Sequence, residues 1–297
     1  MPRSVEADAS GALDPAIVRR HFERAATRFD SAAALPREIG ERLLGRLDLI
    51  RLQPERALDL GAGTGVVAQA LLRRYRGAQV YAVDSAACML VLARRRGAWW
   101  RRPRVVCADA ERLPLAAASM NMVVSNLMLP WCLPPDAALA EIRRVLAPGG
   151  VLLFSTLGPD TLIELRRSWA RVDALPHVNP FMDMHDVGDA LLRAGFADPV
   201  MDVERLEVTY PDVSGLLREL KSLGAGNALS GRARGLGGRS RLQGMIEAYE
   251  RECDAGGRIR ATCEVVYGLA WGGDGMPVRF GETRVPLEML RRGMRPG

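Results

Sequence analysis

The sequence predicts a doubly wound α/β domain with a mostly parallel, seven-stranded sheet. Short apolar runs with strand character alternate with helical segments of about ten residues, an order typical of a parallel sheet that has helices on both faces. The turn Asp59-Leu60-Gly61-Ala62-Gly63-Thr64-Gly65 joins the first of these runs to a helix. A chain of 297 residues, 48% of them apolar, can bury a core of the size that this fold needs.

The first half of the chain carries two leading helices and then the alternating core. Apolar residues recur at three-to-four spacing over 15–49, where Pro36 is expected to separate two helices. Strands are predicted at 57–60, 80–83, 104–107, 122–125 and 151–155, and helices at 66–75, 88–96 and 136–146, the last with Asp136 as its N-cap.

Beyond Thr156 the alternation stops and helices dominate. Helices are predicted at 161–172, 186–194, 213–223 and 239–252, and extended segments at 200–210 and 263–271. The two late strands are expected to close the sheet edge, one of them antiparallel, and the helices to form a lid over the carboxyl ends of the strands, where ligands bind in such sheets. The predicted division is 1–50 for helices covering a cofactor site, 51–156 for the cofactor-binding core, 157–275 for the lid and closing strands, and 276–297 for a C-terminal tail.

The composition of the chain predicts the kind of partner that it binds and the cellular compartment in which it lies. The net charge of +6 and the pI of about 9.4 favour an acidic partner. The five cysteines are scattered, without a Cys-x-x-Cys pair or a neighbouring histidine, so the sequence predicts neither a disulfide framework nor a metal site. Scattered thiols also predict a location in the reducing cytoplasm. It also predicts no secretory signal and no membrane span, because the apolar runs are far shorter than the roughly 20 residues that a spanning helix needs.

The glycine-rich turn indicates a nucleoside ligand without a phosphate group. Gly61, Gly63 and Gly65 let the backbone turn tightly and approach a ligand closely. A dinucleotide fingerprint needs a further glycine where this chain has Val66, so a pyrophosphate is disfavoured. S-adenosylmethionine fits instead, because its ammonium can meet the carboxylate of Asp59 and its carboxylate can meet N–H groups at the start of the next helix.

Polar residues end the next three strands as well. Asp84 is placed for the two ribose hydroxyls, Asp109 for the adenine ring, and Asn126 for the region beside the transfer site. The predicted cofactor site comprises Asp59, Gly61, Ala62, Gly63, Gly65, Asp84, Ser85, Met89, Asp109, Ala110 and Asn126. Each acid could alternatively cap a helix or form a turn, but four polar residues at four successive strand ends favour a cofactor site.

The reaction expected at such a site is an in-line transfer of the methyl group from sulfur to a nucleophile. It requires proximity, alignment and exclusion of water, so no catalytic residue is assigned. The chain has only three histidines, His21, His177 and His185, and no convincing nucleophile–base pair. A substrate that is already an anion, such as a carboxylate, would need no base.

The chain resembles the malonyl-acyl-carrier-protein O-methyltransferases of biotin synthesis. The resemblance runs from about Phe22 to Trp271. It rests on the segments Ala108-Asp109-Ala110-Glu111-Arg112-Leu113-Pro114, Ser125-Asn126-Leu127 with Trp131-Cys132, Ser155-Thr156-Leu157-Gly158-Pro159-Asp160-Thr161-Leu162, His177-Val178-Asn179 with Phe181, Ala194-Gly195-Phe196-Ala197-Asp198-Pro199 and Glu264-Val265-Val266-Tyr267-Gly268. It implies a Rossmann-like class I methyltransferase fold and S-adenosylmethionine-dependent methylation of the free carboxyl of a malonyl thioester, which primes pimeloyl synthesis.

The same resemblance implies an acidic acyl carrier protein as partner. Arg166, Arg167, Arg218 and Lys221 in the lid half are candidates for its contact surface, and Phe29, Trp131, His177, Asn179 and Phe181 are the predicted substrate pocket. The chain departs from the family at four positions, with Phe29 for tyrosine, Pro36 for glutamine, Ala62 for cysteine and Pro130 for glutamine. Phe29 and Pro130 each remove a polar group near the predicted transfer site, which puts substrate choice and activity in question.

Three other functions fit part of the pattern. A methyltransferase for another small acid or a quinone-like ring would use the same cofactor, although a ring would require a base. A non-catalytic assembly or interaction protein could keep the fold and the cofactor. A nucleic-acid methyltransferase would suit the positive charge, but the fourth strand is followed by Asn126-Leu127-Met128-Leu129 rather than an Asn-Pro-Pro-Tyr type of motif.

Overall fold

A computed structural model describes residues 12–97, 100–232, 238–253 and 256–273, and the predicted tail 276–297 lies outside these residues. The helices are α1 (Pro15–Ala32), α2 (Ala34–Gly45), η2 (Arg46–Leu49), α3 (Val66–Arg74), α4 (Ala87–Arg95), η3 (Leu129–Trp131), α5 (Asp136–Val145), α6 (Ile163–Ala170), α7 (Met184–Arg193), α8 (Val213–Ser222) and α9 (Arg239–Glu250). The strands are β1 (Arg56–Leu60), β2 (Gln79–Asp84), β3 (Arg104–Cys107), β4 (Met120–Asn126), β5 (Leu146–Leu157), β6 (Phe196–Tyr210) and β7 (Ile259–Gly272).

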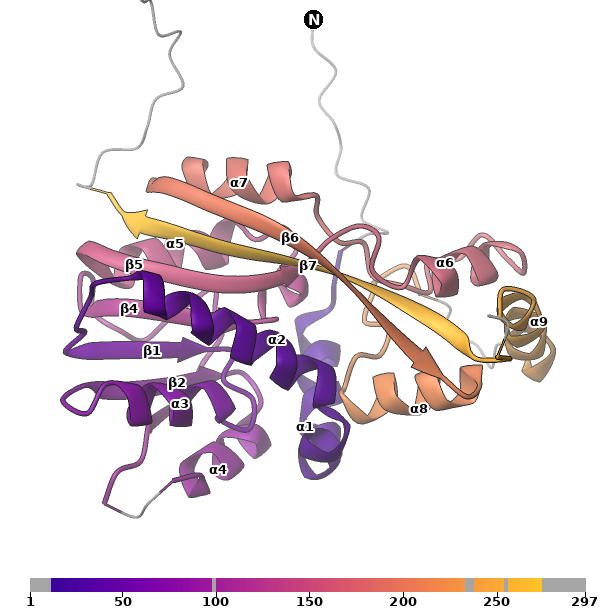
Figure 1. The fold of residues 1–297 in the computed structure, drawn as a ribbon, viewed down its shortest axis with the longest axis horizontal. Coiled ribbons are helices and arrows are strands. Elements are labelled where there is room, and N and C mark those ends of the chain that lie inside the picture. The colour runs from indigo at the N-terminus through magenta and orange to yellow at the C-terminus, as the bar shows by residue number, and fades with distance from the viewer. Residues whose placement is uncertain (1–11, 98–99, 233–237, 254–255, 274–297) are drawn as a thin grey trace, which may run out of the picture.

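The described strands form one seven-stranded sheet in the order β3-β2-β1-β4-β5-β7-β6. β7 pairs antiparallel with both neighbours, and every other pair is parallel. The predicted fold class is therefore confirmed, including one antiparallel strand near the edge. Figure 1 shows β6 and β7 as long strands at one edge of the sheet that extend past the ends of the shorter parallel ones.

Both faces of the sheet are covered because successive strand residues point to opposite sides and both sets are apolar. In β4, Met122 and Val124 pack with α2 and α3 on one face, while Val123 packs with α5 and α7 on the other. These residues are fully buried. Residues 122–124 are therefore all apolar instead of alternating between apolar and polar, as expected for an interior parallel strand.

A second, smaller core lies beyond the carboxyl ends of the parallel strands. β7 pairs with β5 only from Val265 onward, so its first residues and the last residues of β6 form a ribbon that extends past the sheet. Leu165 of α6, Leu216 of α8 and Met245 of α9 pack around this ribbon (Figure 1). α7 instead packs on the sheet face beside α5.

Two local predictions were wrong. The break between α1 and α2 is at Ala33 rather than at Pro36. Pro36 lies in the first turn of α2, where a backbone N–H has no acceptor within the helix, so the missing N–H of proline costs no hydrogen bond. Asp136 is the first residue of α5 rather than its N-cap, and its carboxylate accepts a hydrogen bond from Arg193 Nε of α7 at 3.0 Å. Tertiary contacts thus use both residues differently from the local rules.

α1 and the residues before it are attached to the segment between α8 and α9 as well as to the core. The N–H of Asp14 donates to the carbonyl of Ala228, and the N–H of Ser230 donates to that of Ala12. α1 also contacts α4 and α8 (Figure 1). Among the described residues, no helix is both long enough and apolar enough to cross a bilayer.

Candidate cofactor and substrate cavity

The turn after β1 is held by backbone hydrogen bonds to the neighbouring strand. The N–H groups of Gly61 and Ala62 donate to the carbonyl of Val83 at 2.9 and 3.0 Å, and the N–H of Gly65 donates to Ala62 at 2.8 Å. Gly61, Gly63 and Gly65 all have positive φ, a conformation that side chains disfavour. The turn thus lies against the carboxyl ends of β1 and β2.

The three glycines are required for different reasons. A Cβ on Gly61 would lie 2.4 Å from the Cβ of Met128, and one on Gly65 would lie 2.7 Å from that of Ala93. A Cβ on Gly63 would meet nothing within 4 Å, although Gly63 lines the cavity. Close packing therefore requires glycine at positions 61 and 65, while Gly63 leaves the open approach that a bound ligand would fill.

This contrast gives a stability prediction. Gly61→Ala is expected to lower the free energy of unfolding by about 2–3 kcal/mol, because it adds a steric clash to the strain of positive φ, and Gly63→Ala by only about 1 kcal/mol from strain alone. Denaturant unfolding of the two variants measures both. Equal losses would contradict the assigned contact with Met128.

Asp59 is buried at the end of β1 and caps the following helix. Its Oδ2 accepts a hydrogen bond from the N–H of Ala68 at 2.7 Å, in the first turn of α3, whose N-cap Gly65 has no side chain. Burial raises the pKa of Asp59 to about 7, and the charge of Asp84 adds to the rise. A cation beside this carboxylate would restore its ionised form.

Asp84, at the end of β2, fixes two turns at once. Its Oδ2 accepts from the N–H of Gly63 and its Oδ1 from that of Ala86, both at 2.8 Å. Burial raises the pKa of Asp84, and these backbone hydrogen bonds act against the rise. Each oxygen keeps a further acceptor position, so the carboxylate can still receive hydroxyl groups.

The remaining predicted cofactor residues surround the same space. Ser85, Asp109 and Ala110 line the cavity, as does Met89 of α4, which is buried. Asp109 accepts a hydrogen bond from the N–H of Glu111 at 3.0 Å. No described residue accepts a hydrogen bond from the N–H of Val66 or Val67, at the start of α3. These donors fit the carboxylate of a ligand that joins an amino acid to a nucleoside. The acids fit the ammonium of the amino acid and the hydroxyls of the ribose.

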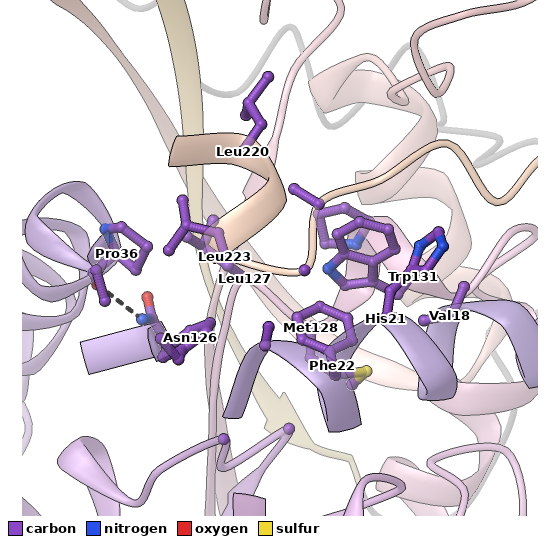
Figure 2. Close-up of a pocket in the computed structure, with 18 of the residues that line it drawn as sticks. Val18, His21, Phe22, Pro36, Asn126, Leu127, Met128, Trp131, Leu220 and Leu223 are labelled. Atoms are coloured by element: carbon purple, nitrogen blue, oxygen red, sulfur yellow. Dashed lines mark hydrogen bonds between the residues drawn. The ribbon is translucent and has the colours of Figure 1, made fainter. Parts of the chain in front are cut away.

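Asn126 is engaged with protein on both sides of its amide. Its Nδ2 donates to the carbonyl of Pro36 at 3.0 Å (Figure 2), and its Oδ1 accepts from Ser155 Oγ at 2.8 Å. A Cβ on Gly40 would lie 3.1 Å from Nδ2, so α2 packs closely on this amide. Asn126 lines the cavity and also ties α2 to the end of β4.

An aromatic wall forms the other part of the cavity. Phe22 of α1 and Trp131 of η3 meet edge to face, with ring centroids 5.1 Å apart. Phe29 lines the cavity from the same helix and packs in a cluster with Met89. Figure 2 shows Phe22 and His21 of α1, Trp131, and Leu220 of α8 around the same space. Sequence reasoning missed Phe22, His21 and Leu220, because helical periodicity does not separate a cavity wall from a core.

The three predicted residues between α6 and α7 also line the cavity. His177 stacks on Trp169 at a centroid distance of 3.6 Å, and its Nε2 lies 2.8 Å from Asp173 Oδ1. Asn179 is buried, and its Oδ1 has no hydrogen-bond partner among the described residues. Phe181 completes this side. The structure thus brings all the predicted cofactor and pocket residues except Gly65 to the lining of one cavity, and their individual roles stay predictions.

A polar clamp that the sequence did not reveal fastens α1 over the glycine turn. Thr64 Oγ1 donates to Asp30 Oδ1 at 2.6 Å, and Arg96 Nε donates to the carbonyl of Thr64 at 2.7 Å. Arg96 also forms an ion pair with Asp30. These residues come from three separated segments, so only the folded chain brings them together.

The cavity has a volume of about 1670 Å³. Sites for one small molecule commonly occupy about 300–1,000 Å³. The cavity therefore has room for a nucleoside cofactor beside the acids and for a second molecule against the aromatic wall. Among the described residues, no cluster of His, Cys, Asp or Glu side chains is arranged to hold a metal ion.

Comparison with known proteins identifies close relatives over nearly the whole chain. Residues 58–154 match the family described as a methyltransferase domain. A malonyl-[acyl-carrier protein] O-methyltransferase of Halorhodospira halophila is 49% identical over 95% of this chain and 97% of its own length. The protein of the same name from Laribacter hongkongensis is 52% identical over 87% of this chain and 89% of its own length.

Solved structures show the same fold at low sequence identity. A SAM-dependent methyltransferase of Thermotoga maritima has a TM-score of 0.53 and 19% identity, covering 86% of this chain and 99% of that one. The YcgJ protein of Bacillus subtilis has a TM-score of 0.58 and 16% identity, covering 79% of this chain and 99% of that one. At these identities the likeness is one of fold alone.

Proposed function

This chain belongs to the family of malonyl-[acyl-carrier protein] O-methyltransferases, and from that premise we propose that it methylates the free carboxylate of a malonyl thioester carried on acyl carrier protein. S-adenosylmethionine is the proposed methyl donor. The methyl ester formed would prime pimeloyl and biotin synthesis. The observation that carries the proposal is one cavity lined by strand-end acids at one part and by an aromatic wall at the other.

The strand-end residues are proposed to hold the cofactor. Asp59 would face its ammonium, Asp84 its ribose hydroxyls and Asp109 the region of its adenine ring. A cofactor that carries an ammonium and a sulfonium suits a site in which burial has raised the pKa values of Asp59 and Asp84, because its positive charge favours their ionised forms.

The proposed reaction needs alignment rather than proton transfer. A carboxylate oxygen supplies the electron pair for the new O–C bond while the C–S bond breaks, so the anion and the sulfonium become a neutral ester and a neutral thioether. An apolar wall favours this loss of charge, and Phe22, Phe29 and Trp131 provide it. A carboxylate nucleophile requires no general base, so no such role is assigned to His177, which contacts Asp173.

The three segments of the chain are proposed to have different roles. Residues 1–50 would cover the cofactor, 51–156 bind it, and 157–275 form the substrate side. The clamp of Asp30 on Thr64 and Arg96 supports the first assignment, and the placement of α6, α8 and α9 around the β6–β7 ribbon supports the third.

An assay of the carrier itself tests the proposal. Purified enzyme with labelled S-adenosylmethionine is expected to add one methyl group to malonyl-carrier protein, and none to the carrier without malonate, as read from the intact mass of the carrier. Cofactor binding without transfer, next to an active relative as control, would reject the proposal in favour of a non-catalytic protein. Transfer to another small acid alone would reject the malonyl substrate.

A further inference from the structure

Two helices frame an entrance to the cavity with exposed basic residues. Arg24 and Arg28 of α1, and Arg218 and Lys221 of α8, are exposed and also belong to the cavity lining. α1 and α8 are in contact at the carboxyl ends of the parallel strands (Figure 1). We call these four residues the basic rim. The apolar side chains of Phe22 and Leu220, from the same two helices, line the same cavity (Figure 2).

The charge of the basic rim is largely uncompensated within the described part of the chain. No described carboxylate lies within 4.0 Å of the charged groups of Arg24, Arg28 or Lys221, and Arg218 has only Asp212, at 3.9 Å. The neighbouring acids are used elsewhere, since Asp30 pairs with Arg96 and Glu219 accepts a hydrogen bond from Tyr210 at 3.0 Å. Glu23 of α1 is half-buried.

A group just inside the entrance reports the same positive potential. The pKa of His21 is lowered, first by burial and further by the charges of Arg24, Arg232 and Arg20, although a hydrogen bond with the Gly226 backbone opposes the shift. The positive field therefore extends from the exposed rim to the cavity wall. Such a field raises the rate at which an acidic partner meets this surface.

We propose that the basic rim is the surface on which the carrier protein docks, so that the face of the carrier around its acyl group is acidic. This inference rests on the proposed function, because a substrate attached to a protein must enter a cavity through an opening against which that protein can lie. The positive charge of the basic rim favours an acidic carrier as the bound partner, and the entrance between α1 and α8 gives the position at which it docks.

This location differs from the surface expected from the sequence. Arg218 and Lys221 belong to the basic rim, but Arg166 points inward, where its Nη1 donates to the carbonyl of Pro159 at 2.8 Å and its Nη2 to that of Thr161 at 3.4 Å. Arg167 is exposed on α6 but does not line the cavity. α1 supplies the basic residues that sequence reasoning assigned to α6.

Charge reversal on each helix tests the proposal. R24E/R28E on α1 and R218E/K221E on α8 are each expected to raise KM for malonyl-carrier protein at least about tenfold, with kcat little changed, because rim charges act mainly on encounter. The matched control is R51E/R56E, which reverses two exposed arginines before and at the start of β1, at the amino end of this strand rather than at its carboxyl end. Its KM is expected to stay near that of the wild type.

A small substrate separates docking from catalysis. KM for the malonyl thioester of N-acetylcysteamine, which has no carrier, is expected to rise much less in the rim variants than KM for the carrier does. Raising the salt concentration should raise KM for the carrier in the wild type and much less in the rim variants, because the attraction between surface charges is screened.

The outcomes separate this proposal from the one on which it rests. A wild type that does not methylate malonyl-carrier protein would reject the proposed function. A wild type that does, with KM for the carrier equal in the rim and control variants, would reject only the docking surface. Thermal unfolding and cofactor binding identify a misfolded variant, and the pair on the other helix then decides the question.

Discussion

Replacing Asp84 by alanine is expected to weaken binding of S-adenosylmethionine by about 100- to 1,000-fold. Two hydrogen bonds from ribose hydroxyls to an ionised acceptor, taken at about 1.5–2 kcal/mol each, together contribute about 3–4 kcal/mol, which corresponds to that range. The variant also loses the acceptors for the N–H groups of Gly63 and Ala86, so the glycine turn loses part of its support. Calorimetric titration with the cofactor measures the loss.

The asparagine variant separates ligand contact from support of the turn. Asp84→Asn keeps the shape of the side chain and one acceptor oxygen, so it should keep one of the two backbone hydrogen bonds and still fold, while its affinity falls about tenfold or more through the lost charge. Circular dichroism and thermal unfolding check the fold of both variants. Unchanged affinity in folded Asp84→Ala would remove the ribose role from this residue.

The order of strands and helices could be predicted because local patterns and global packing agree over most of the chain. β4 is apolar on both faces because it is an interior strand, and its sequence alone shows this. The patterns failed where a distant contact decides. The first residues of β7 form a strand because they pair with β6 beyond the end of β5, a partner that no local spacing reveals.

The acidic part of the cavity was predictable, and much of its other wall was not. The carboxyl ends of parallel strands meet at one edge of the sheet, so the strand pattern alone groups Asp59, Asp84 and Asp109. The approach of Phe22 to Trp131 depends on how α1 packs against the core. Asn126 was predicted to face the ligand, and its amide also joins α2 to Ser155.

The affinity for S-adenosylmethionine is expected to rise about twentyfold from pH 5.5 to pH 7.5. Burial raises the pKa of Asp59 to about 7, so in the free protein this carboxyl is mostly protonated at the lower pH and mostly ionised at the higher one. The bound ammonium requires the ionised form. Binding at pH 6 should therefore release nearly one proton, which titrations in two buffers of different ionisation enthalpy can count.

The asparagine variant identifies the group responsible. Asp59→Asn cannot ionise, so its affinity should be nearly independent of pH and, at pH 7.5, about 100-fold below that of the wild type, as expected for the loss of a buried charge-assisted contact. Asp84 is the other buried acid whose pKa is raised, and Asp84→Asn should keep the pH dependence if Asp59 is its source. A pH-independent wild type would contradict the proposed pairing of Asp59 with the ammonium.

The raised pKa of Asp59 has the opposite effect on the stability of the free protein. Cofactor affinity should rise with pH, whereas the stability of the free protein should fall. An acid whose pKa is higher in the folded than in the unfolded state holds its proton longer when folded, so the stability of the free protein should fall as the pH rises from about 4 to about 7. The cofactor-bound protein should show no such fall from Asp59, because the bound cation keeps the carboxylate ionised. Denaturant unfolding across this pH range, with and without cofactor and in Asp59→Asn, thus tests the site through stability alone, independently of methyl transfer.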